Sequence, residues 1–197
     1  MEPTDHNLRA WEARHAQMEG QGLPRWVLDG LPDVAGRHVL ELACGAGLAS
    51  AELAALGALL TGLDDSAEEL EAARARVPNA VFIQANVREL PAELQRRRFD
   101  AVLGSAATPA RQVAAALRPG GEFVLYDTHP VLGCLDAALR WRESYFREGA
   151  LPLGAIVTSV ARAGFVVVSL DEAPAVERRR QDPRVPAEFM LRARKPA

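Results

Sequence analysis

The residues best suited to chemistry lie in a glycine-containing turn, ELACGAG at residues 41–47, and in an acidic position downstream of it. Gly45 and Gly47 leave room for a ligand to approach the backbone, and the helix expected next would direct free N–H groups at the turn. Asp64, which ends the next apolar run, could accept hydrogen bonds from both hydroxyls of a ribose. The pattern predicts a site for a ligand that contains a nucleoside.

This turn differs from the glycine fingerprint of dinucleotide-binding proteins. The sixth position of that fingerprint is usually Gly or Ala and is Ser50 in this chain. Glu41 places a carboxylate at the end of the strand, where it would repel a pyrophosphate but would suit an ammonium or other positive group. A nicotinamide-dependent oxidoreductase is therefore a less favoured alternative, and an ordinary turn between a strand and a helix is the purely structural one.

Alternating strands and helices position these residues, which favours an α/β fold with a parallel sheet and helices on both faces. We expect the final two strands to form an antiparallel pair at one edge. The expected strands span residues 38–43, 59–63, 80–85, 100–105, 122–126, 165–170 and 188–193. The expected helices span residues 5–20, 25–31, 48–56, 66–76 (with Ser66 as N-cap and Glu69 as its capping-box partner), 109–117, 132–146 and 153–163.

Composition excludes several classes of protein. The 23 Lys and Arg and 26 Asp and Glu residues give a net charge of −3, which disfavours a nucleic-acid partner. Cys44 and Cys134 are too few for a disulfide framework or a four-ligand zinc site, and we expect no metal. No apolar run reaches the roughly 18–20 residues of a membrane helix, and the polar N-terminus is unlike a secretory signal. We expect a cytoplasmic monomer or homodimer with no membrane partner.

Four segments, in order, resemble the motifs of the class I S-adenosylmethionine-dependent methyltransferases, in particular the small members that act on small molecules. The matching segments are HVLELACGAG at 38–47, TGLDDSAEELEAAR at 61–74, FIQANVRELP at 82–91, and RFDAVLGSA at 98–106 followed by ALRPGGEFVLYD at 116–127. The resemblance implies a Rossmann-like, mostly parallel, seven-stranded sheet of order 3-2-1-4-5-7-6. It also implies S-adenosyl-L-methionine as cofactor and S-adenosyl-L-homocysteine as product.

The resemblance further implies one methyltransferase domain over residues 1–197. Its parts would be an N-terminal helical lid segment (1–35), a cofactor-binding core (36–127), and substrate-side helices with the final strand pair (128–197).

The roles implied around the methionine part of the cofactor fall on the glycine turn. The backbone of Ala43, Gly45 and Gly47 should pass under it, and the family usually has glycine where Ala43 stands. An alanine is acceptable there if its φ is negative. Glu41 should serve the amino group of the cofactor through water, or brace the turn.

The roles implied around the nucleoside part fall at the ends of the later strands. Asp64 should accept from the ribose hydroxyls, and Asp65 could pack against the adenine edge. Asn86, where the family usually has Asp, should accept from the adenine amino group, and Val87 should offer its backbone N–H to a ring nitrogen. Ser105, at the end of the fourth strand, should face the methyl-transfer crevice.

Methyl transfer depends mainly on positioning the acceptor and excluding water, so a catalytic triad is not required. His129, after the fifth strand, is the candidate catalytic residue, and the alternative is a loop histidine hydrogen-bonded to the backbone. Trp11 and Arg14, with His15, are expected to close over the cofactor, and the alternative is a helix packed on the outside. We predict methyl transfer to a small-molecule substrate. The alternative is a sensor or partner subunit that binds the cofactor without turnover.

Overall fold

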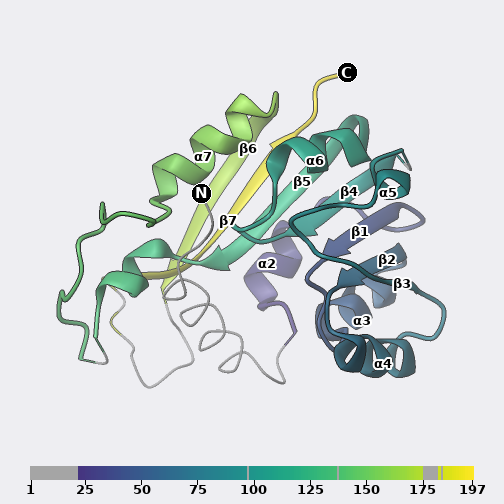
Figure 1. Ribbon diagram of the computed structural model, residues 1–197, viewed down its shortest axis with the longest axis horizontal. Coiled ribbons are helices and arrows are strands. Elements are labelled where there is room, and N and C mark those ends of the chain that lie inside the picture. The colour runs from purple at the N-terminus through teal and green to yellow at the C-terminus, as the bar shows by residue number, and fades with distance from the viewer. Residues whose placement is uncertain (1–21, 97, 137, 175–181, 183) are drawn as a thin grey trace.

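The computed structural model describes residues 22–96, 98–136, 138–174, 182 and 184–197, and its centre is one seven-stranded sheet (Figure 1). The strands are β1 His38–Leu42, β2 Leu59–Asp64, β3 Val81–Gln84, β4 Phe99–Gly104, β5 Leu117–Thr128, β6 Val166–Pro174 and β7 Pro186–Arg194. Their order is β3-β2-β1-β4-β5-β7-β6. Strands β1 to β5 pair in parallel, and β7 is antiparallel to β5 and β6. The predicted Rossmann-like order and antiparallel edge pair are confirmed.

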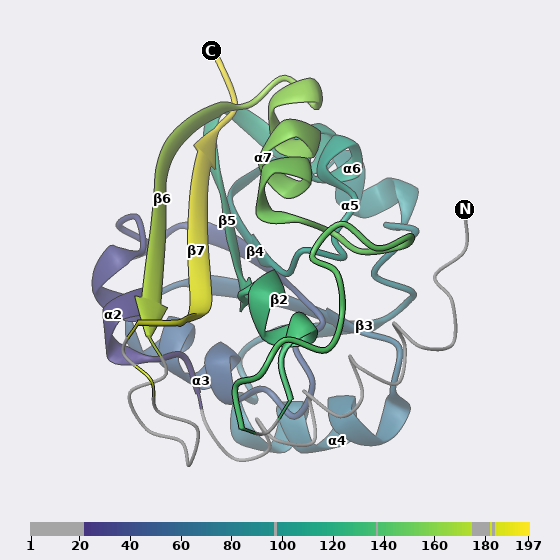
Figure 2. The ribbon, with the colours of Figure 1, turned by 90° about the vertical axis from the view of Figure 1, so that its left-hand side faces the viewer.

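Helices cover both faces of the sheet. They are α2 Arg25–Gly30, α3 Leu48–Ala55, α4 Ala67–Arg76, α5 Ala92–Arg96, α6 Ala110–Ala116, α7 Leu153–Arg162 and the 3-10 helix η1 Pro130–Cys134. Figure 2 shows α5, α6 and α7 together on one side of the sheet and α2 and α3 on the other. This arrangement agrees with the apolar pattern, because parallel strands buried on both faces read as continuous apolar runs.

The core divides into two main clusters, one on each face. On one face Val113 of α6 and Ile156 of α7 pack with Phe123 of β5. On the other face Val27 of α2 and Leu53 of α3 pack against the sheet. Both clusters hold the central strands rigidly, so the carboxyl ends of β1, β2, β4 and β5 have fixed positions.

The start of α4 shows how a local signal positions a site residue. The Ser66 hydroxyl accepts a hydrogen bond from the Glu69 backbone N–H at 3.3 Å, so Ser66 is the N-cap that the sequence predicted. The Ser66 backbone N–H donates to Asp64 Oδ1 at 3.0 Å. Asp64 therefore takes the bond that a capping-box glutamate would accept, and this contact fixes its carboxylate at the end of β2.

The predicted helix over residues 132–146 is wrong. The chain instead forms η1 and then a series of turns, in which Leu139 has a φ of 58° and Leu135 bridges Trp141. The Asp136 carboxylate accepts from the Ala138 and Arg140 backbone N–H groups and from the Arg142 guanidinium. These local bonds compete with helical ones, which is why an aspartate disfavours a helix interior.

Other element boundaries differ in smaller ways. The short helix α5, directly after Pro91, was not predicted. Strand β5 begins at Leu117, where the sequence predicted the end of a helix, and its register with β4 shifts between Phe99 and Ala101. The expected helix over residues 5–20 lies outside the described residues.

Candidate cofactor site

The glycine turn connects β1 to α3 through an unusual backbone. Ala43, Gly45 and Gly47 have φ values of 57°, 50° and 76°, so three of five consecutive residues are left-handed. A Cβ on Gly47 would lie 2.9 Å from Ala73 Cβ of α4, so close packing also requires glycine there. The condition placed on Ala43 is not met, because its φ is positive. This conformation costs an L-residue about 1–2 kcal/mol.

Asp64 connects this turn to the end of β2 by a hydrogen bond. Its Oδ2 accepts from the Gly45 backbone N–H at 2.8 Å, and its Oδ1 accepts from the Ser66 N–H. The Cys44 N–H donates to the Leu63 carbonyl at 3.0 Å. A carboxylate has about four lone-pair sites, so one remains on each oxygen for further donors such as ribose hydroxyls.

Glu41 lies behind the turn and is almost fully buried, at 4% exposure. Its Oε2 accepts from the Ser50 hydroxyl at 2.5 Å. Burial raises the pKa of the Glu41 carboxyl to about 7; the Ser50 hydrogen bond opposes this rise, and the Asp64 and Glu52 carboxylates add to it. Burial likewise raises the pKa of the neighbouring Cys44 thiol, helped by Glu41, so this cysteine is a neutral packing residue at pH 7.

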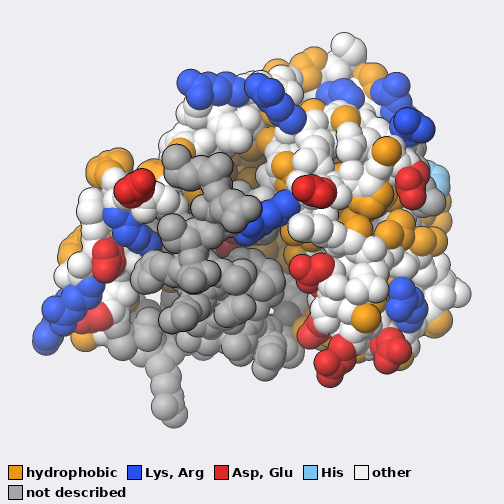
Figure 3. Space-filling model, viewed as in Figure 1, with side chains coloured by type: hydrophobic (Ala, Val, Ile, Leu, Met, Phe, Trp, Pro, Cys, Tyr) orange, Lys and Arg blue, Asp and Glu red, His pale blue; other side chains and the backbone are white. Residues whose placement is uncertain are grey.

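The surroundings of the turn carry negative charge. Acidic side chains gather over α4 in Figure 3, and Glu68 and Glu69 lie in its first turn. A Cβ on Gly45 would lie 3.6 Å from Glu69 Oε2. Together with Glu41 and Asp64, these groups favour a ligand with a positive charge at this end of the site.

The other residues predicted to contact the nucleoside follow β2 and β3. Asp65 is exposed, and its carbonyl accepts from Gln84 Nε2 at 3.0 Å. Asn86 is also exposed, and its Oδ1 accepts from the Arg88 N–H at 2.9 Å in an Asx turn. Val87 is half-buried against the core. The Asn86 oxygen therefore keeps one lone pair for a further donor.

Gln112 of α6 holds the segment that follows Asn86, a contact that the sequence did not predict. Its Oε1 accepts from the Leu90 N–H at 2.6 Å, and its Nε2 donates to the Arg88 carbonyl at 2.9 Å. Both bonds hold the segment after Asn86 against α6. The only signal in the sequence was a polar side chain, beside Arg111, in a helix otherwise made of four Ala and one Val.

The end of β4 forms a tight turn in front of α6. The Ser105 N–H donates to Thr108 Oγ1 at 3.0 Å, and the Thr108 N–H donates back to the Ser105 carbonyl at 3.0 Å. The Ala106 N–H donates to Asp127 Oδ2 of β5 at 3.0 Å. Ser105 therefore lies at the carboxyl edge of the sheet, where it was predicted.

His129 follows β5 and is buried, at 6% exposure. Its Nδ1 accepts from the Val131 N–H at 3.1 Å, and its Nε2 lies 2.8 Å from Glu172 Oε1 of β6. Its ring meets that of Phe189 edge to face. Burial lowers the pKa of the imidazole, and the Glu172 carboxylate opposes this shift. Both ring nitrogens are thus engaged within the protein, so this geometry gives the predicted catalytic role no support and agrees with the alternative of a hydrogen-bonded loop histidine.

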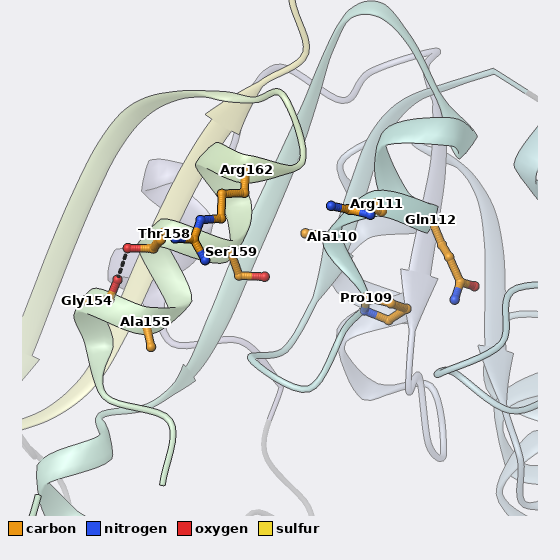
Figure 4. A pocket seen from close by; sticks show the side chains of 9 residues that line it. All are labelled: Pro109, Ala110, Arg111, Gln112, Gly154, Ala155, Thr158, Ser159 and Arg162. Atoms are coloured by element: carbon orange, nitrogen blue, oxygen red, sulfur yellow. Dashed lines mark hydrogen bonds between the residues drawn. The ribbon is translucent and has the colours of Figure 1, made fainter. Parts of the chain in front are cut away.

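An open groove of about 670 Å³ lies between α6 and α7 (Figure 4). Arg111 lies on its α6 side and Arg162 on its α7 side, and Thr158 Oγ1 donates to the Gly154 carbonyl at 2.7 Å. None of the residues predicted for the cofactor lines this groove. The groove is therefore separate from the glycine turn.

Trp11 and Arg14 lie outside the described residues. Within the described part of the chain, no group of three or more His, Cys, Asp or Glu side chains could hold a metal ion. No helix in that part has the length and apolar character needed to cross a bilayer.

The chain is similar in sequence to known methyltransferases. Residues 39–121 match the family described as a methyltransferase domain. The chain is 38% identical over 112 residues to an uncharacterized methyltransferase of Synechocystis sp., covering 52% of each protein. It is 32% identical over 135 residues to the trans-aconitate 2-methyltransferase of Paracidovorax citrulli, covering 60% of this chain and 52% of the relative. The chain spans about half the length of these curated relatives.

The fold is also shared with solved structures. An S-adenosylmethionine-dependent methyltransferase from Mesorhizobium loti superposes with a TM-score of 0.69 at 22% identity. The match covers 86% of this chain and 96% of that one. At this identity the likeness establishes the fold.

Proposed function

We propose that the chain is a class I S-adenosylmethionine-dependent methyltransferase and that it transfers the methyl group of S-adenosyl-L-methionine to a small-molecule acceptor. The match of residues 39–121 to a methyltransferase domain and the shared fold support this proposal. The observation that carries the proposal is the Asp64 carboxylate. It accepts from Gly45 and Ser66 and keeps lone pairs at the carboxyl ends of β1 and β2. Ligands of such sheets bind at this edge.

The cofactor would lie across the ends of β1, β2 and β3. Its methionine part would follow the backbone of Ala43, Gly45 and Gly47, with its ammonium group toward Glu41. The left-handed conformations turn this backbone around the ligand without bulky side chains. The negative groups near the turn suit the positive charges of the sulfonium and ammonium.

The nucleoside part would continue along the same edge. Asp64 would accept from the ribose hydroxyls, and Asp65 would lie beside the adenine edge. Asn86 would use its remaining lone pair for the adenine amino group, and the Val87 N–H would serve a ring nitrogen. The Gln112 bonds to Arg88 and Leu90 would keep this segment in position.

When bound, the cofactor would supply an electrophilic methyl group, which an acceptor nucleophile would take in line with the bond to sulfur, while the electron pair of that bond would stay on the departing S-adenosyl-L-homocysteine. Any proton on the acceptor passes to solvent. The protein's contribution would be positioning and exclusion of water.

Ser105 would lie beside the crevice, and His129 would hold the edge of β5 through its bonds to Val131 and Glu172. A cover formed by Trp11 and Arg14 stays a prediction.

A small-molecule acceptor is supported by the acidic balance of the chain, which disfavours nucleic acid. The relative that methylates trans-aconitate adds a small organic acid as one acceptor class to test. The second candidate function is cofactor binding without turnover. Ala43 favours it, because its methyl group adds bulk at a point where the cofactor would approach the backbone closely.

The test is transfer of a labelled methyl group from S-adenosyl-L-methionine to pools of small acids, phenols and amines. We expect label in at least one pool with the wild-type chain and a large loss with Asp64→Ala. Tight cofactor binding with no label in any pool would favour the second function.

A further inference from the structure

Ser50 and Glu41 form a buried pair behind the glycine turn. Ser50 is fully buried, and its hydroxyl donates to Glu41 Oε2 at 2.5 Å. Glu41 belongs to β1 and Ser50 to the first turn of α3, so this bond joins the two elements that flank the turn. The Glu41 carboxyl is therefore tied to both flanks of the glycine turn.

The groups around Glu41 oppose its ionisation. Asp64 on β2 and Glu52 on α3 are both negative, and Cys44 in the turn is a neutral thiol. On the α4 side, Glu69 lies toward Gly45, and the Arg76 guanidinium donates to the Ala46 carbonyl. Burial and like charges favour the protonated carboxyl, and the Ser50 hydrogen bond favours the ionised one.

We propose that Ser50 is a positioning residue that acts through Glu41: its hydroxyl favours the ionised carboxylate that the cofactor's ammonium group selects, so that cofactor binding expels a proton from Glu41. The inference rests on the proposed function. With its pKa raised to about 7, Glu41 in the free protein would be a mixture of carboxylic acid and carboxylate near pH 7. A bound ammonium group stabilises the carboxylate, and the proton from the acid form leaves to solvent.

This coupling has a measurable stoichiometry. A carboxyl with a pKa of about 7 is half protonated at pH 7, so binding should release up to about half a proton per cofactor. The affinity for the cofactor should rise with pH between 6 and 8, because a smaller fraction of Glu41 is protonated and fewer protons have to be released on binding. Without the Ser50 hydroxyl the free protein holds more protonated Glu41, so Ser50→Ala should release more protons and bind roughly threefold or more weakly at pH 7.

The experiment is calorimetric titration of the full chain with S-adenosyl-L-homocysteine, in pairs of buffers with different ionisation enthalpies, from pH 6.0 to 8.5. The buffer dependence of the heat gives the number of protons released. We expect proton release with the wild-type chain, more with Ser50→Ala, and none with Glu41→Gln. Glu71→Gln, on the exposed side of α4, is the matched control and should behave as wild type.

The outcomes separate the proposals. Binding with equal heats in all buffers would overturn the proton coupling, even if Ser50→Ala failed to fold, because the wild-type measurement alone decides it. A loss of affinity in Ser50→Ala that stays constant up to pH 8.5 would overturn the proposal that Ser50 acts through Glu41. It would show that Ser50 has a purely structural role. No binding by the wild-type chain at any pH would instead contradict the proposed function.

Discussion

The carboxyl edge of the sheet is built differently at its two ends. At the ends of β1 and β2, the Asp64 carboxylate accepts from two backbone N–H groups and keeps lone pairs for a ligand. At the end of β5, His129 uses both ring nitrogens within the protein. Beyond it, residues 138–151 expose Trp141 and Phe146, at 61% and 81%. The end at β1 and β2, which we propose binds the cofactor (the cofactor end), is thus preformed by backbone geometry. The end at β5, which we propose faces the acceptor (the acceptor end), depends on irregular segments.

The largest expected effect concerns the pH dependence of stability at the preformed end. Burial raises the pKa of Glu41 from 4.5 to about 7, so this carboxyl binds a proton more tightly in the folded protein than in the unfolded protein. This contribution to stability is present below pH 4.5 and is lost as the pH rises through 7. Relative to Glu41→Gln, the wild-type chain should lose about 3 kcal/mol of unfolding free energy between acidic and mildly alkaline pH.

Urea unfolding of both proteins at pH 5 and pH 8 measures this difference. Glu71→Gln serves as a control for loss of one exposed carboxylate. A wild-type to Glu41→Gln difference that does not change with pH would mean that Glu41 is ionised throughout this range.

Asp64 and Asn86, the two polar residues that we propose bind the nucleoside, should differ in their effect on cofactor binding. Asp64→Ala removes charge-assisted bonds, worth about 1.5–3 kcal/mol, and also releases the Gly45 N–H. Asn86→Ala removes one neutral bond, worth roughly 0.5–1.5 kcal/mol. Titration with S-adenosyl-L-homocysteine should therefore show the larger loss for Asp64→Ala, and equal losses would refute the ribose assignment.

The other end of the edge should respond in stability and not in cofactor binding. His129→Ala removes the bonds to Val131 and Glu172 and the contact with Phe189, at a cost of about 2 kcal/mol. Thermal unfolding and cofactor titration test both halves of this expectation, with the exposed His38→Ala as control. A stable His129→Ala chain that binds cofactor but no longer transfers methyl groups would restore the predicted catalytic role.

The smallest effect is a gain. Ala43 holds a φ of 57°, which glycine adopts without strain. Ala43→Gly should raise the unfolding free energy by about 1 kcal/mol, since relief of strain exceeds the entropic cost of glycine. Denaturant unfolding measures this gain, and Ala46→Gly in the same turn should give none. A loss of stability in Ala43→Gly would show that the turn is not strained.

The cofactor end could be predicted from sequence because its signals are local. Left-handed positions favour glycine, and serine is a common N-cap at the start of a helix. The residue types of Gly45, Gly47 and Ser66 therefore indicate the local backbone conformation. The strand order followed from the resemblance carried by the four motifs. The Glu41–Ser50 bond was not predicted, because only the folded turn brings the two side chains together.

The acceptor end was less predictable for a physical reason. Leu135 and Leu139 have helical spacing, but the bonds of Asp136 and the left-handed Leu139 replace the helix with turns. The role of Gln112 depends on partners 22 and 24 residues away in sequence. Such contacts follow from tertiary structure and leave only a weak trace in a local pattern.

The most direct measurement is titration of the wild-type chain with S-adenosyl-L-homocysteine, followed by calorimetry and thermal unfolding. The preformed turn, Asp64 and Glu41 predict saturable binding of one molecule per chain. At about 100 times the dissociation constant, the ligand should stabilise the fold by about 2.7 kcal/mol. Absence of binding heat and of any thermal shift at millimolar ligand would contradict the assignment of this edge as a cofactor site.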